Sequence, residues 1–343
     1  MKQNNDKAEK KLGKLEPVSN SDQISEIKKV PKFKKMIVKT GSDPSLRIDK
    51  LPFDNQFLDK LTNGGLPIGK QTLIYGESHV GKTFLLQMIF KAAQARDKKA
   101  IFIDADKGFE PEWWQAVGVD IDKLIVAQPN TGEQAFDLVH ELMQQDYDLI
   151  AIDSLDLLVP TVELENTMED QTMGLQARMN ATGLRKSKKY NTKTVFICTN
   201  HVRNGMGRFA QMSLPGGKAQ EEMSSVMLWV ARGGAIKESE VTAGGDDKKK
   251  VGFKMRVTIE KDKINGALYE KTEIPFMYAG GTIDVVGGVV ELLVENELIE
   301  HKGPYFTLYN GDKMLGKLNV KKYLAEHPDV LEEYKKKLAQ QEV

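Results

Sequence analysis

One segment of the chain has the spacing G-x-x-x-x-G-K-[S/T], a pattern typical of phosphate-binding loops. Its residues are Gly76, Glu77, Ser78, His79, Val80, Gly81, Lys82 and Thr83. Backbone N–H groups of such a loop, and of a helix that follows it, surround phosphate oxygens. Lys82 is expected to reach the β- and γ-phosphates, and the Thr83 hydroxyl to bind Mg²⁺. The sequence therefore predicts a site for ATP and magnesium.

Acidic residues at the ends of two apolar runs are candidates for the rest of this chemistry. Asp153 ends the run 149–153, which places a carboxylate at the sheet edge where ligands of parallel α/β folds bind. We expect Asp153 to hold the magnesium ion, directly or through water. Asp104 and Asp106 follow the run 100–104, and one of them is a candidate to orient or deprotonate the attacking water. The alternative is that both are ordinary turn formers.

Residues 171–218 contain no aspartate or glutamate but nine basic side chains, namely Arg178, Arg185, Lys186, Lys188, Lys189, Lys193, Arg203, Arg208 and Lys218. Two segments here read as loops, around 166–174 and 204–217, and both follow strands expected to end beside the phosphate loop. Positive charge concentrated beside an ATP site indicates a track for nucleic acid. The alternative is a basic helix face that pairs with acids elsewhere, such as those in 153–170. Trp113 and Trp114 lie outside this tract, and either pack in the core or face an adenine.

These residues need a scaffold of alternating strands and helices. Short apolar runs recur at 71–75, 100–104, 124–127, 149–153, 194–199 and 226–231, with helical patterns at 83–95 and 133–145 between them. This alternation predicts a mainly parallel sheet covered by helices on both faces. We expect three parts: an N-terminal arm over 1–50, an ATPase core over 51–280 and a small α+β domain over 281–343. In the arm we predict a helix ending near Lys29 and a strand-like run at Met36–Lys39, and the arm is either a solvated tail or a docking segment.

Composition excludes several classes of protein. The 343 residues are 40% hydrophobic and 29% charged, which is enough for a substantial core and argues against a disordered chain. Basic and acidic residues number 49 each, so the overall charge names no partner. The single cysteine, Cys198, excludes an intramolecular disulfide and fits a reducing cytosol. There is no apolar run of membrane-spanning length and no signal peptide at the start, so we expect a cytoplasmic protein with no membrane partner.

Many ordered stretches resemble bacterial RecA proteins, the DNA strand-exchange recombinases, from about Lys32 to the C-terminus. They include GGLPIGKQTLIYGES-HVGKT, FIDADKGFEP, GVDIDKLIVAQPNTGEQA, IAIDS, MGLQARM, TNHVR, PGG and EKDKI. The resemblance implies a RecA-type P-loop ATPase core that forms filaments on single-stranded DNA, with ATP bound between adjacent subunits. It further implies homologous pairing with duplex DNA and strand exchange in recombination and repair.

The resemblance also implies roles for individual residues. Asp106 stands at the position of a water-activating glutamate, and Glu110 and Trp113 at positions that contact adenine. Lys261 and Lys263 match paired lysines that reach the neighbouring subunit's γ-phosphate, and His201 stands where a glutamine links the γ-phosphate to the second DNA loop. The matching DNA-binding residues are Met173, Gly174, Arg178 and Arg185 for a first loop (about 166–175), and Arg203, Arg208, Gly216 and Gly217 for a second (203–217).

Three departures from the family pattern are local. Asp106 is one methylene shorter than glutamate, His201 replaces glutamine, and Glu221-Glu222 replaces a Lys-Phe pair. The short Asp106 favours an alternative function, a DNA-annealing or filament scaffold protein that binds ATP with little hydrolysis. A hexameric motor or helicase is a third interpretation. Proteins of that class, however, would lack the Gly-rich second loop and the C-terminal domain that this sequence has.

Overall fold

A computed structural model describes residues 19–34, 36–167, 174–203, 213–241, 246, 248–278, 289–290, 293–294 and 296–341. The chain divides into two compact units, residues 1–48 and 49–343. None of the helices in these described ranges is long and apolar enough to cross a membrane.

Among its described residues, 19–34 and 36–48, the first unit has one α-helix, α1 (Asn20–Lys29), and two short 3-10 turns, η2 (Pro31–Phe33) and η3 (Pro44–Leu46). The Ser19 side chain accepts a hydrogen bond from the Asp22 N–H and caps α1. The predicted helix ending at Lys29 is confirmed. The predicted strand at Met36–Lys39 is wrong, because these residues have no strand conformation. A strand requires a partner for its backbone N–H and C=O groups, and a local pattern does not specify one.

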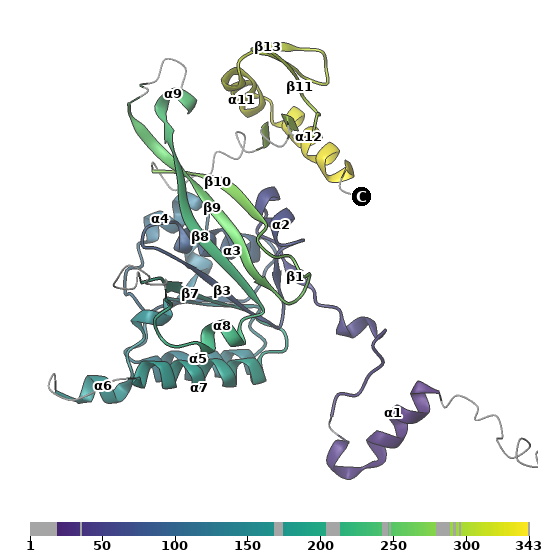
Figure 1. The fold of residues 1–343 in the computed structure, drawn as a ribbon, viewed down its shortest axis with the longest axis vertical. Coiled ribbons are helices and arrows are strands. Elements are labelled where there is room, and N and C mark those ends of the chain that lie inside the picture. The colour runs from purple at the N-terminus through teal and green to yellow at the C-terminus, as the bar shows by residue number, and fades with distance from the viewer. Residues whose placement is uncertain are drawn as a thin grey trace, which may run out of the picture. The chain divides into compact units, whose positions relative to one another are not determined.

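The second unit is organised around an eight-stranded sheet with the order β10-β9-β8-β3-β7-β6-β4-β5 (Figure 1). Its strands are β3 (Gln71–Gly76), β4 (Ala100–Asp104), β5 (Ile125–Ala127), β6 (Leu149–Asp153), β7 (Val195–His201), β8 (Val226–Lys237), β9 (Lys250–Asp262) and β10 (Lys271–Met277). The strands from β8 to β5 pair in parallel, whereas β9 and β10 are antiparallel. The predicted mixed α/β fold with a mainly parallel central sheet is confirmed.

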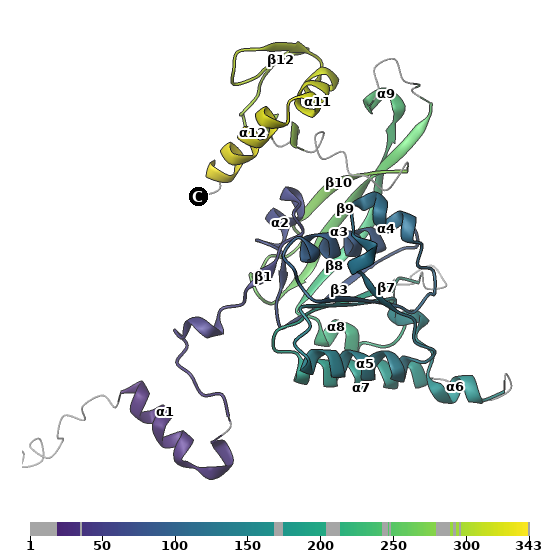
Figure 2. The same cartoon turned by 180° about the vertical axis from the view of Figure 1, so that it is seen from behind.

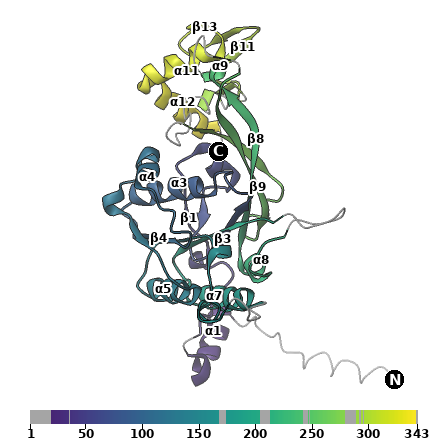
Figure 3. The ribbon, with the colours of Figure 1, turned by 90° about the vertical axis from the view of Figure 1, so that its left-hand side faces the viewer.

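Helices cover both faces of this sheet (Figure 3). The helices described between residues 49 and 278 are α2 (Gln56–Leu61), α3 (Lys82–Gln94), α4 (Pro111–Val117), α5 (Gly132–Gln144), α6 (Thr161–Glu165), α7 (Leu175–Tyr190), α8 (Ala219–Met223) and α9 (Glu238–Val241), of which α9 lies at the tip of the β8–β9 hairpin (Figure 1). Shorter elements are β1 (Lys50–Leu51), paired with β2 (Leu66–Pro67), and the 3-10 turns η4 (Ile121–Lys123) and η5 (Leu155–Leu157).

The apolar side chains of each buried strand point alternately to the two faces of the sheet and so contribute to two apolar cores. In β6, Leu149 and Ala151 join the core formed with α3, whereas Ile150 and Ile152 join the core formed with α5 and α7. Successive side chains of a strand point to opposite faces, so a strand that is apolar at every position is buried on both sides. Figure 2 shows α5 and α7 running side by side along one face. The two layers fix the carboxyl ends of β3, β6 and β7 at one edge of the sheet.

A third apolar cluster belongs to the C-terminal residues. It joins a three-stranded antiparallel sheet, β11 (Glu300–Lys302), β12 (Tyr305–Thr307) and β13 (Lys313–Leu315), to α11 (Lys317–Glu326) and α12 (Pro328–Gln341). Val290, Leu293, Leu324 and Tyr334 are fully buried in it. The Gly-rich boundary expected near 279–288 lies outside the described residues, so the proposed domain limit rests on the sequence.

Candidate functional site

The phosphate loop lies between the end of β3 at Gly76 and the start of α3 at Lys82. Both glycines are required by their surroundings. A Cβ on Gly76 would lie 2.1 Å from the Val230 carbonyl oxygen, and Gly81 has a φ of 102°, a conformation that side chains other than hydrogen rarely adopt. Val80 is buried and anchors the loop, while Glu77, Ser78 and His79 are exposed. The loop therefore presents its outer backbone to a ligand at the N-terminus of a helix of 13 residues.

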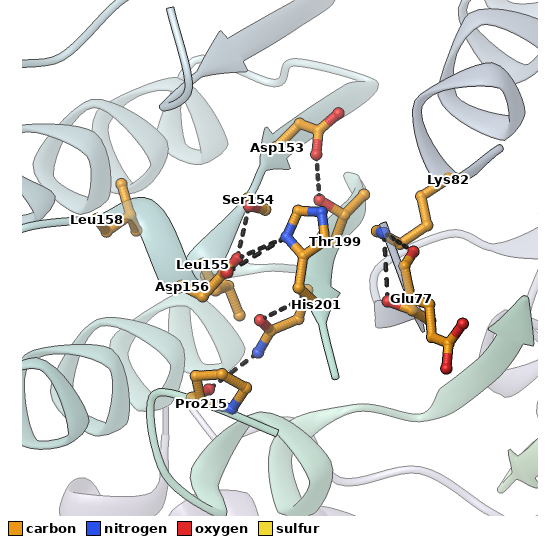
Figure 4. Close-up of polar contacts among 12 residues, drawn as sticks. Glu77, Lys82, Asp153, Ser154, Leu155, Asp156, Leu158, Thr199, His201 and Pro215 are labelled. Carbon is orange, nitrogen blue, oxygen red and sulfur yellow. Dashed lines mark hydrogen bonds and ion pairs between the residues drawn. The ribbon is translucent and has the colours of Figure 1, made fainter. Parts of the chain in front are cut away.

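The Lys82 ammonium lies beneath this loop and holds its backbone (Figure 4). Its Nζ donates to the carbonyl oxygens of Glu77 at 2.7 Å and Gly76 at 3.3 Å. The side chain is only 5% exposed, and burial lowers the pKa of Lys82 to about 8, while Asp153 and Asp156 act in the opposite direction. A buried cation held only by neutral carbonyls is poorly compensated, so a phosphate group at this position would relieve the cost of its burial.

Thr83 and Asp153 meet beside Lys82, although 70 residues separate them in the sequence. The Thr83 hydroxyl donates to Asp153 Oδ2 at 2.6 Å, and the Thr199 hydroxyl donates to Asp153 Oδ1. Burial raises the pKa of Asp153, and the two hydroxyls and Lys82 act in the opposite direction. A hydroxyl and a carboxylate are the hard oxygen donors that suit Mg²⁺. In the described part of the chain no three His, Cys, Asp or Glu side chains are grouped so as to hold a metal ion by themselves.

The two carboxylates after β4 have different environments. Asp104 is buried and accepts hydrogen bonds from the Gly108 and Phe109 N–H groups and, at 2.8 Å, from Gln128 Nε2. Asp106 is exposed. Because Asp104 is occupied in holding the loop after β4, Asp106 is the carboxylate of this pair that remains available to a ligand.

The two adjacent tryptophans of α4 also lie in different environments. Trp114 is 2% exposed and packs among Phe90, Phe102 and Phe109. Trp113 is 50% exposed, and Glu110, at the N-cap of α4, is exposed as well. Of the two readings left open by the sequence, the core position therefore belongs to Trp114, and only Trp113 is accessible to a base.

His201 ends β7 and contacts a residue that the sequence analysis did not single out. Its Nδ1 lies 3.2 Å from each carboxylate oxygen of Asp156, which follows β6 in the turn η5. Ser154 Oγ donates to Asp156 Oδ1 at 2.6 Å. The only signal in the sequence was a second acid three residues after Asp153, and its proximity to His201 depends on β6 and β7 being neighbours.

The basic residues of α7 form an exposed face. Arg178 and Arg185 are both exposed, as are Lys186, Lys188 and Lys189. None of these five makes an ion pair with a described residue, whereas Lys193, after the end of α7, pairs with Asp146 at 2.9 Å. The alternative that this face pairs with acids has no support from the described part of 153–170. Gly174 caps α7 with a φ of 78°, and Met173 lies outside the described residues.

The ends of the second loop are fixed, whereas residues 204–212, including Arg208, lie outside the described residues. Arg203 and Ser213 exchange two backbone hydrogen bonds, at 3.0 and 3.1 Å. Gly216 and Gly217 have φ near 85° and pack on α7, where a Cβ on Gly216 would lie 2.5 Å from Asn180 Nδ2. The loop is therefore closed at its base and held against the basic helix.

Lys261 and Lys263 lie at the other edge of the sheet from the phosphate loop. Asp262, between them, is in register with Val226, which pairs with Thr72 at the start of β3. Gly76 at the end of β3 is about 13 Å further along the strand. The Lys261 Nζ donates to the Glu221 carbonyl oxygen on α8, and burial and the nearby Lys263 lower the pKa of Lys261. Neither lysine is grouped with the phosphate loop of its own chain. Glu221 and Glu222 are exposed.

Comparison with known families agrees with this arrangement. The family model described as the RecA N-terminal domain matches residues 20–283, which include α1, the turn between β3 and α3, the basic helix α7 and the two antiparallel strands β9 and β10. On this match, the chain belongs to the RecA family of DNA recombinases.

Proposed function

We propose that this protein is an ATP-dependent recombinase that assembles on single-stranded DNA, pairs it with homologous duplex DNA and exchanges strands. The observation that carries the proposal is the convergence at one sheet edge. The phosphate loop follows β3, the Thr83–Asp153 pair lies beside it, and the two segments proposed to bind DNA follow the neighbouring strands β6 and β7. ATP and DNA bound there would both contact residues at the carboxyl ends of neighbouring strands in one sheet.

The nucleotide half of the proposal assigns roles by chemistry. The loop N–H groups and the α3 N-terminus bind the phosphates, and Lys82 neutralises the β- and γ-phosphate charge. Thr83 and Asp153 would hold Mg²⁺, which when bound supplies further neutralisation of these phosphates. Asp106 would accept a hydrogen bond from the attacking water, and Trp113 with Glu110 would contact the adenine.

The DNA half rests on exposed, unpaired charge. Arg178 and Arg185 are exposed, seven positions apart on α7, so they lie on the same side of the helix. Arg203, Gly216 and Gly217 frame the base of the second loop beside this helix. Guanidinium groups on a helix face and glycine backbone at a loop end suit contact with phosphates. Met173 and Arg208 lie outside the described residues, and we include them among the proposed DNA contacts on the basis of the sequence alone.

Assembly follows from where Lys261 and Lys263 lie. Two lysines that cannot reach the phosphate loop of their own chain are available to a neighbouring subunit, and a head-to-tail contact of this kind builds a helical filament when it does not close. We therefore propose that ATP binds between subunits, with these lysines completing the site in trans.

One observation favours a second candidate, an ATP-binding annealing or scaffold protein with little hydrolysis. Asp106 is short and exposed, and no described residue is recorded as holding its carboxylate in place. A mobile carboxylate is a poor orienting group, since small misplacements of a catalytic group cost about 100-fold in rate.

Two measurements on the full chain test the proposal. Steady-state ATPase activity should depend on single-stranded DNA and disappear in Lys82→Ala, and electron microscopy with a slowly hydrolysed ATP analogue should show helical filaments on DNA. Rings would indicate the motor class. Filaments with negligible ATPase would select the scaffold function, and full activity in Lys82→Ala would contradict the nucleotide site.

A further inference from the structure

Asp156 and His201 form a polar pair between the two strands that lead to the DNA loops. Both carboxylate oxygens of Asp156 lie 3.2 Å from His201 Nδ1. The Asp156 side chain is 8% exposed and that of His201 30% exposed. Ser154 Oγ donates to Asp156 Oδ1 and fixes the carboxylate from the other side. Figure 4 shows the imidazole ring between Asp156 and the Thr199–Asp153 pair.

Each partner is also tied to the root of one loop. The Asp156 carbonyl oxygen accepts a hydrogen bond from Gln176 Nε2 of α7 at 2.9 Å, next to the end of the first loop. On the other side, the His201 N–H donates to Asn200 Oδ1, and Asn200 Nδ2 donates to the Pro215 carbonyl oxygen at the end of the second loop. A displacement of the ring would therefore be transmitted to both segments.

The hydrogen bonds restrict what the ring can bind. A carboxylate only accepts hydrogen bonds, so the proton on His201 must be on Nδ1, and Nε2 is then the nitrogen that faces away from Asp156. In a neutral ring Nε2 is an acceptor, as are phosphate oxygens, and the two cannot bond. Only the imidazolium donates from Nε2. The carboxylates beside the ring are Asp156 on η5 and Asp153 at the end of β6, and the charge of Lys82 on α3 acts on these same two carboxylates.

We propose that Asp156 is a positioning residue for His201: it orients the ring, holds a proton on Nδ1 and turns Nε2 away from itself, so that Nε2 of the imidazolium is the atom that donates to the γ-phosphate of ATP. The pair then links the nucleotide to the roots of both DNA loops. The phosphate contact rests on the proposed function, but the orientation of the ring does not.

The first test reads the ring directly in the nucleotide-free protein. Long-range ¹H–¹⁵N NMR distinguishes the two tautomers and follows protonation, and His201→Gln assigns the signal among the five histidines. We expect the proton on Nδ1 in the wild type, and a mixture of the two tautomers in Asp156→Ala, which removes the acceptor. An Nε2–H tautomer in the wild type, or an unchanged tautomer in Asp156→Ala, would overturn the proposal.

The second test measures the link to DNA. The quantity is the ratio of single-stranded DNA affinities with a slowly hydrolysed ATP analogue and with ADP. Asp156→Ala should lower this ratio about tenfold when His201 is present and should have no further effect in the His201→Gln background.

The controls separate the possible failures. Glu163→Ala removes an equal charge from exposed α6 and should leave the ratio unchanged. A merely structural Asp156 would lower the ratio equally in both backgrounds, which contradicts the proposal, and Asp156→Asn decides the matter if Asp156→Ala does not fold. If the DNA affinity of the wild type is the same with the ATP analogue and with ADP, the proposed function is refuted. The NMR result would still decide the orientation of His201.

Discussion

Lys82 and Asp153 are opposite charges on which burial acts in opposite directions. Burial lowers the pKa of Lys82 to about 8 and raises that of Asp153, since a low-polarity surrounding disfavours either charged form. Each group improves the other's environment without neutralising it fully. This is the electrostatic state expected of a site whose main ligand, a polyphosphate with its magnesium ion, supplies the missing charges.

The pKa of Lys82 predicts a pH dependence of ATP binding. Below its pKa of about 8 the ammonium is present, and affinity should be nearly constant. Above it, free protein must take up a proton before it binds phosphate, so affinity should fall, by at most about tenfold per pH unit. Isothermal titration of ATP between about pH 7 and about pH 9.5 checks this. In Lys82→Arg the cation persists at every pH, so its profile should be flat. A parallel decline in both proteins would exclude Lys82 as the titrating group.

The two carboxylates after β4 should respond oppositely to substitution. Asp104→Ala leaves two backbone N–H groups and Gln128 without their acceptor, so it should lower the free energy of unfolding by about 1–3 kcal/mol. Asp106→Asn should leave stability unchanged and reduce DNA-dependent ATPase activity, whereas Asp106→Glu should raise turnover by extending the carboxylate toward the water. Urea denaturation and ATPase assays on the three variants check this. An unimpaired Asp106→Asn would remove Asp106 from the proposed mechanism.

At the scale of elements, α7 has two faces with different tasks. Its buried face packs on α5, where His140 Nε2 lies 3.1 Å from the Gly183 carbonyl oxygen and 3.2 Å from Ser187 Oγ. Its other face carries Arg178 and Arg185 into solvent. Because α7 is closely packed on α5, Arg178 and Arg185 are held in a fixed position relative to the sheet.

The buried face leaves no room for a side chain at Gly183. A Cβ there would lie 2.3 Å from the Phe136 ring. Alanine favours a helix over glycine by about 1 kcal/mol, but overpacking costs about 1–3 kcal/mol, so Gly183→Ala should be neutral to destabilising by up to about 2 kcal/mol. The exposed neighbour Thr182→Ala receives only the gain in propensity and should be slightly stabilising. Denaturant unfolding compares them, and a Gly183→Ala variant as stabilised as Thr182→Ala would show that the helices move apart freely.

The exposed face should contribute to DNA affinity through charge alone. Arg178→Ala and Arg185→Ala should each weaken binding to all single-stranded sequences and reduce the slope of log affinity against log salt by about 0.7. Lys193→Ala is the matched control, because Lys193 is already paired with Asp146. Salt titrations by fluorescence anisotropy measure the slopes. Equal slopes for all three variants would indicate that α7 does not contact DNA.

At the scale of the whole molecule, the proposed site is divided between two edges of one sheet. The phosphate loop occupies the carboxyl edge of β3, and Lys261 and Lys263 occupy the edge where β3 begins. No rearrangement of side chains brings these together in one chain, since the sheet between them is rigid and buried. On the proposed function, activity should therefore require contact between two subunits.

This division predicts complementation between two inactive variants. Lys82→Ala lacks the phosphate-loop cation, and a Lys261→Ala/Lys263→Ala double variant lacks the groups offered to the neighbour. Each should be inactive alone, while an equal mixture should recover about a quarter of the wild-type ATPase activity, because about one contact in four then combines two intact halves. Activity of the wild type should also rise cooperatively with protein concentration on DNA. A mixture with no recovery would place the two lysines outside the site.

The sequence by itself determined the features that are local in the chain. The strand runs, the glycine-containing turn between β3 and α3, and helix α1 all follow from the spacing of apolar residues, the positions of glycines and the polar residues at helix starts, which operate within a few residues. These predictions are confirmed as elements of the structure, and the order of strands and helices was sufficient for the fold class.

The tertiary structure decided which side chains meet. Asp156 and His201 are 45 residues apart, and nothing in either segment specifies the other until β6 and β7 pair. The choice between Asp104 and Asp106, and between Trp114 and Trp113, likewise depended on which member of each pair is buried, and burial is set by distant residues. The strand expected at Met36–Lys39 failed for the same reason. Backbone hydrogen bonding between strands and the pairing of buried charges are long-range interactions, so a linear pattern identifies the groups but does not assign their partners.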